Sequence, residues 1–278
     1  MAYDFSLLHT DAADGVLWVT VDAPPINVMT TDLARELAGL GREVLSDDAA
    51  RVVVLQSANP EFFIAHFDVN AILAMPAEGE ATRQAEISGF HRMCERWRTM
   101  DKVTIVKVAG RVGGGGAELS ASCDMRFGVL GRTILNQMEV PIGILPGGTG
   151  TQRLPRLLGR GRAMEVVLGG IDLDAATAER WGWLNRAFAT VEELDAYVEY
   201  LARRIASFPP QAVVNAKAAV LAAEVDPLPG LLEEAYLFDQ LLRRPDARAA
   251  MQKFLAAGGQ TREGELRVGE LNAEINRP

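Results

Sequence analysis

The residues best suited to chemistry are two glutamates that lie close to glycine-containing segments. The first, Glu118, follows four glycines at 113–116, which come shortly after an apolar run over 103–109. Glycines let the backbone approach a ligand that side chains would block, and a helix beginning there offers unpaired N–H groups and the positive end of its dipole. Such a place suits an oxygen that becomes negative during a reaction. Glu118, one helical turn further on, is placed for proton transfer.

The second glutamate, Glu139, lies in an apolar, turn-rich segment over 135–151. If this carboxyl group is buried, its pKa is raised and it holds a proton near neutral pH. The alternative is that Glu139 faces solvent, as most isolated glutamates do. Further along, Gly147 and Gly148 predict a tight turn that positions a helix starting near Thr149.

Two phosphate-binding motifs are excluded by the residues at their key positions. In the dinucleotide pattern G-x-G-x-x-G, the position three residues past Gly115 must be glycine, but it is Glu118. The P-loop spacing exists from Gly143 to Gly148, but Thr149 stands where the phosphate-binding lysine belongs. Taken alone, the glycine run also fits a flexible turn.

The elements that must position these residues alternate between strands and helices. Strands are predicted at 16–21, 51–56, 103–109 and 125–129, and helices at 31–45, at 81–100 and from the glycine run onward. This alternation predicts an α/β core with crossover connections.

Beyond residue 192 the pattern is helical only, with helices predicted at 194–205, 212–223, 230–242 and 245–257. The helix over 230–242 carries an apolar stripe that needs a cover, formed by Leu231, Ala235, Phe238 and Leu242. The core of the same chain and a second subunit are equally good covers for it.

Composition limits the function further. The chain has 278 residues, of which 49% are hydrophobic and 23% charged, enough for one large core with an appendage. Its net charge of −9 argues against a nucleic-acid partner, and no apolar run approaches the ~18 residues that span a bilayer. Two cysteines, three histidines without ligand spacing and no signal-peptide pattern predict a cytoplasmic protein without a metal site or a membrane partner.

Taken together, these segments resemble the crotonase (enoyl-CoA hydratase/isomerase) superfamily. The matching stretches are FFIAHFDV, IVKVAGRVGGGGAELSASCD, LNQMEVPIGILPGGTGTQRLPRLLGRGRAMEVVLGG and AERWGWLNRA. The likeness covers about residues 15–205 and, more weakly, the tail. It implies a spiral of ββα units over 1–205 and a helical oligomerisation region over 206–278, assembled as a homotrimer or homohexamer. It also implies an acyl-CoA thioester as substrate, with coenzyme A as part of that substrate and no separate cofactor.

The resemblance also implies roles for individual residues. The backbone N–H groups of Phe67 and Gly115 would hold the thioester oxygen as an oxyanion hole. Glu118 would activate water and Glu139 would deliver a proton to the α-carbon. Relatives that only shift double bonds often keep just the carboxylate at the Glu139 position, so the presence of both favours an enoyl-CoA hydratase. The alternatives are an isomerase or other acyl-CoA reaction, or a non-catalytic acyl-CoA-binding subunit.

The loop before Phe67 departs from the family pattern. His66 stands where a glycine is common, which predicts backbone strain if a positive φ is needed, and the ring of Phe67 is expected to reshape the acyl pocket. A shape role for His66 is weighed against an added acid–base group. The substrate-binding set implied by the resemblance is Ala65, His66, Asp68, Val69, Gly114, Pro141 and Gly147. Basic residues for the CoA phosphates match poorly, which leaves Lys253 and Phe254 as candidate nucleotide contacts.

Overall fold

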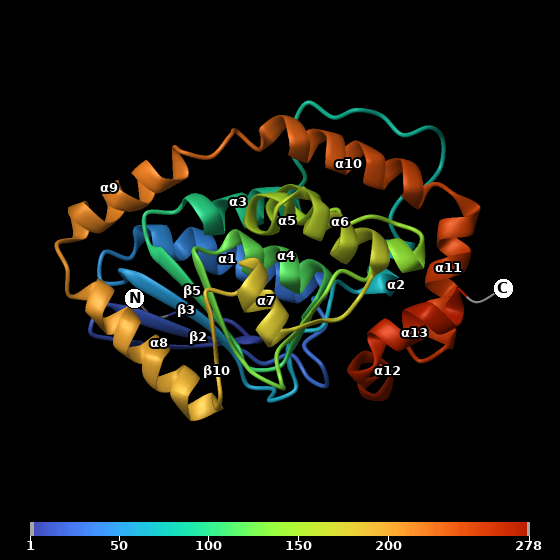
Figure 1. The fold of residues 1–278 in the computed structure, drawn as a ribbon. Helices are drawn as coiled ribbons and strands as arrows, with labels where there is room; N and C mark the ends of the chain where they lie inside the picture. The colour runs from blue at the N-terminus through green and yellow to red at the C-terminus, as the bar shows by residue number, and fades with distance from the viewer. Residues whose placement is uncertain (1–2, 277–278) are drawn as a thin grey trace.

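Two β-sheets form the framework of the computed structural model, which describes residues 3–276 (Figure 1). The six-stranded sheet has the order β1 (Leu8–Ala13), β2 (Val16–Val21), β3 (Val52–Ser57), β5 (Val103–Val108), β7 (Met125–Val129) and β10 (Arg186–Phe188). The four-stranded sheet has the order β4 (Phe62–Ile64), β6 (Arg111–Gly113), β8 (Ile134–Asn136) and β9 (Leu173–Asp174). Only the β1–β2 and β8–β9 pairs are antiparallel.

The chain passes repeatedly from the larger sheet to the smaller one. β3 leads to β4, β5 to β6, and β7 to β8, so each repeat gives one strand to each sheet. Helices α2 (Val69–Leu73) and α3 (Gly89–Thr99) connect β4 to β5, and α4 (Gly114–Ser122) connects β6 to β7. Parallel neighbours require such crossovers, and the result is a spiral. The predicted α/β core is confirmed, as are the four predicted strands, although the short strands of the smaller sheet carried too few residues to show a pattern.

Two sequence expectations about this region need correction. The helix predicted over 81–100 is shorter, because α3 begins only after Ser88, whose hydroxyl accepts a hydrogen bond from the His91 N–H. The preceding residues 81–88 are mostly exposed and have no apolar face to pack. The glycine run is also no loop: it spans the end of β6 and the first turn of α4, which begins at Gly114.

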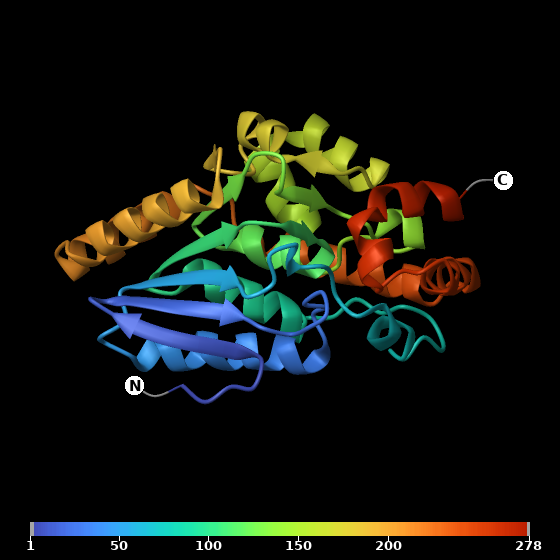
Figure 2. The same ribbon diagram turned by 90° about the horizontal axis from the view of Figure 1, so that it is seen from below.

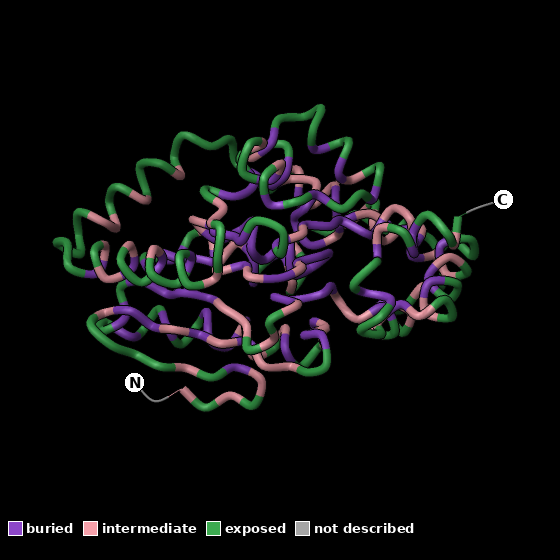
Figure 3. Tube along the Cα trace, turned by 60° about the horizontal axis from the view of Figure 1, so that its bottom comes forward, coloured by how far each residue is buried: buried purple, intermediate pink, exposed green. Residues whose placement is uncertain are grey.

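The remaining helices enclose the sheets. Most of the buried residues, purple in Figure 3, lie in the middle of the molecule, where helices and sheets meet. Helix α1 (Thr31–Glu43) continues into the 3-10 turn η1 (Val44–Ser46), as the prediction over 31–45 indicated. Helix α8 (Val191–Ala206) packs on the larger sheet, and its Leu194 and Val198 belong to one buried cluster with Val52 and Val54 of β3. After β8 come η2 (Val140–Ile142), α5 (Gly150–Leu158), α6 (Arg160–Gly169) and α7 (Ala175–Trp181). Figure 2 shows the strands of the larger sheet side by side from below.

The C-terminal part is helical, with α9 (Pro210–Leu221), α10 (Leu228–Leu242), α11 (Pro245–Ala256), α12 (Arg262–Leu266) and α13 (Val268–Ile275). Helix α10 crosses above α5 and α6, while α11, α12 and α13 gather at one end of the molecule (Figure 1). Leu231 and Leu242 of α10 are buried, so the core of the same chain covers the ends of its apolar stripe. None of the helices between residues 3 and 276 combines the length and apolar character needed to cross a membrane.

Candidate active site

Three neighbouring strands of the smaller sheet bring the predicted site together. β4, β6 and β8 are parallel and adjacent, with Ile64 beside Val112 and Val112 beside Leu135. The carboxyl ends of parallel strands lie at one edge of a sheet. The loop over 65–68, the start of α4 and the segment over 137–139 each follow directly from one of these strands. Segments far apart in the sequence therefore meet at a single edge.

The backbone around Phe67 is held by hydrogen bonds between Met29 and the residues on either side of Phe67. The Met29 N–H donates to the His66 carbonyl (2.8 Å), and the Asp68 N–H donates to the Met29 carbonyl (3.1 Å). These bonds form a parallel bridge between Met29 and Phe67. In such a bridge the N–H of Phe67 itself points to the other side. A Cβ placed on Gly115 would lie 3.7 Å from the Phe67 nitrogen, so the residues of the two predicted donors are neighbours.

Gly114 joins the three segments at their closest approach. Its φ is +43°, a left-handed conformation that glycine adopts without steric cost. A Cβ at this position would lie 2.9 Å from the His66 Cβ and 3.1 Å from Glu139 Oε1. Only glycine therefore lets the His66 loop, α4 and the Glu139 segment pack this tightly.

Glu118 is a buried carboxyl group held by backbone amides. Its Oε1 accepts hydrogen bonds from the N–H groups of Gly148 and Gly150, both at 2.8 Å. The turn over 147–149 and the start of α5 at Gly150 were predicted from the sequence and supply these donors. Burial, and next the charge of Glu234, raise the pKa of Glu118 to about 7, against the opposing effect of the two N–H groups. Glu118 therefore exchanges a proton near neutral pH.

Glu139 is buried too, which settles the choice between burial and exposure left open by the sequence. The side-chain amide of Gln137 faces it; when this amide is turned so that its nitrogen points to the carboxyl group, the nitrogen donates to Oε2 at 2.9 Å and to Oε1 at 3.2 Å. Burial, followed by the charge of Glu118, raises the pKa of Glu139 well above its usual value. Glu139 therefore holds its proton to higher pH than an exposed glutamate.

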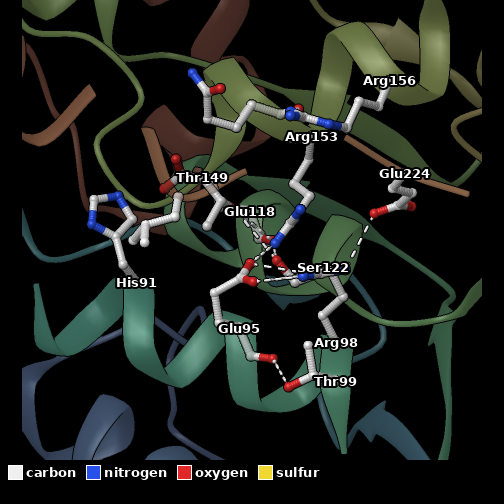
Figure 4. A network of polar contacts seen from close by, with 12 residues as sticks. His91, Glu95, Arg98, Thr99, Glu118, Ser122, Thr149, Arg153, Arg156 and Glu224 are labelled. Atoms are coloured by element: carbon white, nitrogen blue, oxygen red, sulfur yellow. Dashed lines mark hydrogen bonds and ion pairs between the residues drawn. The ribbon is translucent and has the colours of Figure 1, made fainter. Parts of the chain in front are cut away.

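A second layer of buried polar groups surrounds Glu118. The Glu234 carboxylate of α10 binds His91 Nε2 of α3 at 3.0 Å and accepts the Thr151 N–H at 2.9 Å, one residue past the Gly150 donor. Figure 4 shows His91 and Glu118 in this network, together with Arg153, which reaches from α5 to an ion pair with Glu95 on α3. Helices α3, α5 and α10 are thus linked around Glu118.

Two aromatic rings border the site between the oxyanion donors and Glu118. The Phe67 ring meets the Phe90 ring edge to face, with centroids 5.8 Å apart. A Cβ on Gly115 would lie 3.3 Å from Phe90 Cζ, and a Cβ on Gly148 would overlap the same ring. Phe90 is thus the ring partner of Phe67. The role of Phe67 in shaping the acyl pocket stays a prediction.

His66 behaves differently from the expectation of strain. It is absent from the described non-glycine residues with positive φ, so the expected strained backbone is wrong: the neighbouring Gly114 takes the positive φ instead. His66 is buried and binds Glu265 of α12 at 3.0 Å. Phe254 is also fully buried and lies edge-on to the His66 ring, which corrects its assignment as a nucleotide contact, whereas Lys253 is exposed.

The other residues implied to bind substrate divide into two groups. Asp68 and Val69 lie beside Phe67, where Asp68 caps α2 and the Val69 N–H donates to Gln260, and Ala65 abuts Gly113. Pro141 and Gly147 contact other parts of the molecule. Pro141 meets Gly170 and accepts a hydrogen bond from Asn276, while Gly147 lies against the Phe238 ring. Their substrate-binding roles stay predictions.

Several site residues escaped the sequence analysis. Gln137 had a usable signal, because residues two apart on an extended segment share a side and Glu139 follows it at that spacing. Glu234 also had a usable signal, since a glutamate within the apolar stripe of α10 lies on the side of the helix that packs on the core. Phe90 and Glu265 had none, because only the tertiary structure brings them to the site. Among residues 3–276 no three histidine, cysteine or acidic side chains gather as a metal site would require.

Known proteins that are similar to this chain belong to one family. A family model described as enoyl-CoA hydratase/isomerase matches residues 11–260. The chain is 31% identical over 259 residues to a "Probable enoyl-CoA hydratase" of Rhizobium meliloti (strain 1021), covering 92% of this chain and 96% of the relative. It is 30% identical over 242 residues to the short-chain-enoyl-CoA hydratase of Clostridium acetobutylicum, covering 85% and 90%.

Among solved structures, the crystal structure of a "putative enoyl-CoA hydratase" from Streptomyces avermitilis superposes with a TM-score of 0.89 at 37% identity. The superposition covers 99% of this chain and all of that one, so the spiral and the C-terminal helices share one fold with it. Motifs, strand order and both comparisons agree: the chain belongs to the enoyl-CoA hydratase/isomerase family, the crotonase superfamily, and is an enzyme of that family.

Proposed function

We propose that this enzyme adds water to a 2-enoyl-CoA thioester and forms a 3-hydroxyacyl-CoA. The observation that carries the proposal is a pair of buried carboxyl groups with different supports, Glu118 and Glu139, beside the neighbouring N–H groups of Phe67 and Gly115. Hydration needs one group that takes a proton from water and another that gives a proton to carbon. The hydratase names of the relatives support the same reaction.

In this proposal Glu118 acts as the base and Glu139 as the acid. Glu118 takes a proton from water as the water oxygen bonds to C3, and the π electrons move through C2 onto the thioester oxygen. The resulting enolate collapses as Glu139 gives its proton to C2. The proton taken by Glu118 later returns Glu139 to its starting form by way of solvent, so atoms and charge balance. The pKa of about 7 for Glu118 and the strongly raised pKa of Glu139 suit this division of roles.

The thioester oxygen is stabilised by backbone groups in the same proposal. Phe67 and Gly115 donate their N–H groups to it, and α4 begins beside them with the positive end of its dipole toward the site. One preorganised donor of this kind lowers the barrier by about 3–4 kcal/mol. Because these donors are main-chain atoms, substitution of the Phe67 side chain leaves the donor itself in place.

The test is incubation with a panel of 2-enoyl-CoA esters, following loss of the conjugated thioester absorbance. The wild-type enzyme is expected to turn over at least one ester, and Glu118→Ala to lose hydration. Turnover of a 3-enoyl-CoA by both proteins, with no hydration by either, would instead identify an isomerase that uses Glu139 alone. Acyl-CoA binding without any spectral change at high enzyme concentration would identify a non-catalytic subunit and overturn the proposal.

A further inference from the structure

The C-terminal region contacts the loop that carries the proposed oxyanion donor at three residues, His66, Asp68 and Val69. Glu265 of α12 binds the His66 ring, and Gln260 Nε2 donates to Asp68 Oδ1 at 2.8 Å. Gln260 Oε1 accepts the Val69 N–H at 3.1 Å. These contacts flank Phe67 on both sides and come from residues nearly two hundred positions away in the sequence.

The hydrogen bonds of His66 define its charge state. Nδ1 lies 2.8 Å from the Phe67 carbonyl oxygen and Nε2 lies 3.0 Å from Glu265 Oε1. A carbonyl and a carboxylate both accept, and both ring nitrogens can donate only when the ring is protonated. Burial is the largest single influence and opposes this charge, but Glu265, the Phe67 carbonyl and Asp68 together outweigh it and raise the pKa of His66. The ring is therefore an imidazolium that clamps the Phe67 carbonyl.

The clamp acts on the edge of Phe67 that also carries its N–H. The Met29 bridge occupies the other edge of this extended residue, and the N–H and carbonyl of one extended residue point to the same edge. The carbonyl that His66 holds thus belongs to the same residue and edge as the donor N–H. The Glu265 carboxylate also accepts the Gln260 N–H at 2.7 Å, so the ion pair and the Gln260 contacts form one connected set.

We propose that His66, Glu265 and Gln260 are positioning residues for the oxyanion hole, through which the C-terminal helices fix the direction of the Phe67 N–H. The inference rests on the proposed function, because it concerns the same donor. None of the three needs to touch the substrate. A buried ion pair alone is weak evidence for stability, and here its use is orientation of the adjacent peptide. The packing of His66 against Gly114 transmits the same constraint to the start of α4.

The probe for this inference is acetoacetyl-CoA, whose enolate absorbs in the near ultraviolet and reports oxyanion stabilisation without turnover. The substitutions His66→Gln and Glu265→Gln keep side-chain size while removing the ion pair. Each is expected to weaken the enolate band and lower kcat for hydration by about 10-fold or more, with KM changed less than about 3-fold. The double variant is expected to be no worse than either single one, because the pair acts as a unit.

The matched control is Glu274→Gln, which removes an exposed ion pair with Arg267 in the same helical region and should leave the band and kcat unchanged. Should the buried-pair variants fail to fold, Gln260→Asn provides the test, because asparagine tolerates the positive φ of this position but is too short for both loop contacts.

The possible outcomes separate the two proposals. Folded His66→Gln and Glu265→Gln proteins with lower melting temperatures but a wild-type enolate band and kcat would show a merely structural role and overturn this inference alone. A wild-type protein that neither hydrates enoyl esters nor forms the enolate band would overturn the proposed function, and the positioning role with it.

Discussion

Glu118 and Glu139 are both buried carboxyl groups, but different parts of the chain hold them. Two backbone N–H groups, from Gly148 and Gly150, fix one oxygen of Glu118. A single side-chain amide, that of Gln137, contacts Glu139. Backbone donors belong to a turn and a helix start, whereas the amide of Gln137 depends on one side chain.

The different hydrogen-bond donors explain how two carboxyl groups in one site can have different protonation behaviour. Donors directed at a carboxylate favour its charged form, which limits the rise in the pKa of Glu118 to about 7. Glu139 has burial and the charge of Glu118 acting on it, and its pKa stays well raised. The first group is poised to accept a proton and the second to give one. Four experiments test the difference between Glu118 and Glu139.

The largest effect is expected from replacing each acid in turn. Glu139→Gln should lower both hydration and deuterium incorporation at C2 of a saturated acyl-CoA by about 10²–10⁴-fold, because it removes the proton carrier next to C2. Glu118→Gln should lower hydration by a similar factor but affect the exchange far less. The exchange is followed by mass spectrometry in D₂O. Equal losses of exchange in both variants would contradict the assigned division of roles.

The next largest effect concerns the support of Glu118. A Cβ on Gly148 would lie 2.5 Å from Glu118 Oε2 and overlap the Phe90 ring. Gly148→Ala should therefore displace the carboxylate and lower hydration by about 10²-fold, while C2 exchange falls much less. The matched control is Gly161→Ala, where a Cβ meets open space. A Gly148→Ala enzyme with wild-type hydration would show that the backbone cradle is unnecessary.

A smaller effect is expected from the support of Glu139. Hydration needs ionised Glu118 and protonated Glu139, so its rate should rise as pH passes through about 7, where Glu118 ionises, and should fall where Glu139 loses its proton. Gln137→Met removes the donor at similar volume. It should lower kcat by about 10-fold and move the alkaline limb to higher pH, because loss of a donor disfavours the charged form. An alkaline limb that stays in place or moves to lower pH would be inconsistent with this contact.

The smallest effect is on stability. The pKa of Glu118 is about 7 in the folded protein, against 4.5 as the ordinary value, so the folded state binds more protons between these values. The free energy of unfolding contributed by this group therefore falls as pH rises from about 4.5 through about 7. Glu118→Gln removes that loss and should raise the melting temperature by a few degrees at pH 8, but little at pH 4.5. Melting curves that shift equally at both pH values would count against the assignment.

The prediction from sequence succeeded where the pattern was local. The apolar runs at β2, β3, β5 and β7 are long enough to show strand character, and the carboxyl of Glu139 sits among apolar neighbours as its flanks indicated. It failed where the signal was short or distant. β4, β6 and β8 have only three residues each, although they are the strands that deliver the site. The expected strain at His66 was wrong, because His66 has no positive φ and the nearby residue that has one is Gly114, the first residue of α4.

The amino-acid sequence by itself determined which groups are available: a glycine run, a helix start and two glutamates, in the order that marks the family. Only the tertiary structure decided their relation, because parallel pairing of β4, β6 and β8 brings Phe67, Gly115 and Glu139 to one edge of a sheet. The attachment of Gln260 and Glu265 to the loop beside Phe67 is likewise tertiary. Hydrogen bonds act over about 3 Å, whereas these partners are separated by many residues along the chain, so no local pattern encodes their contact.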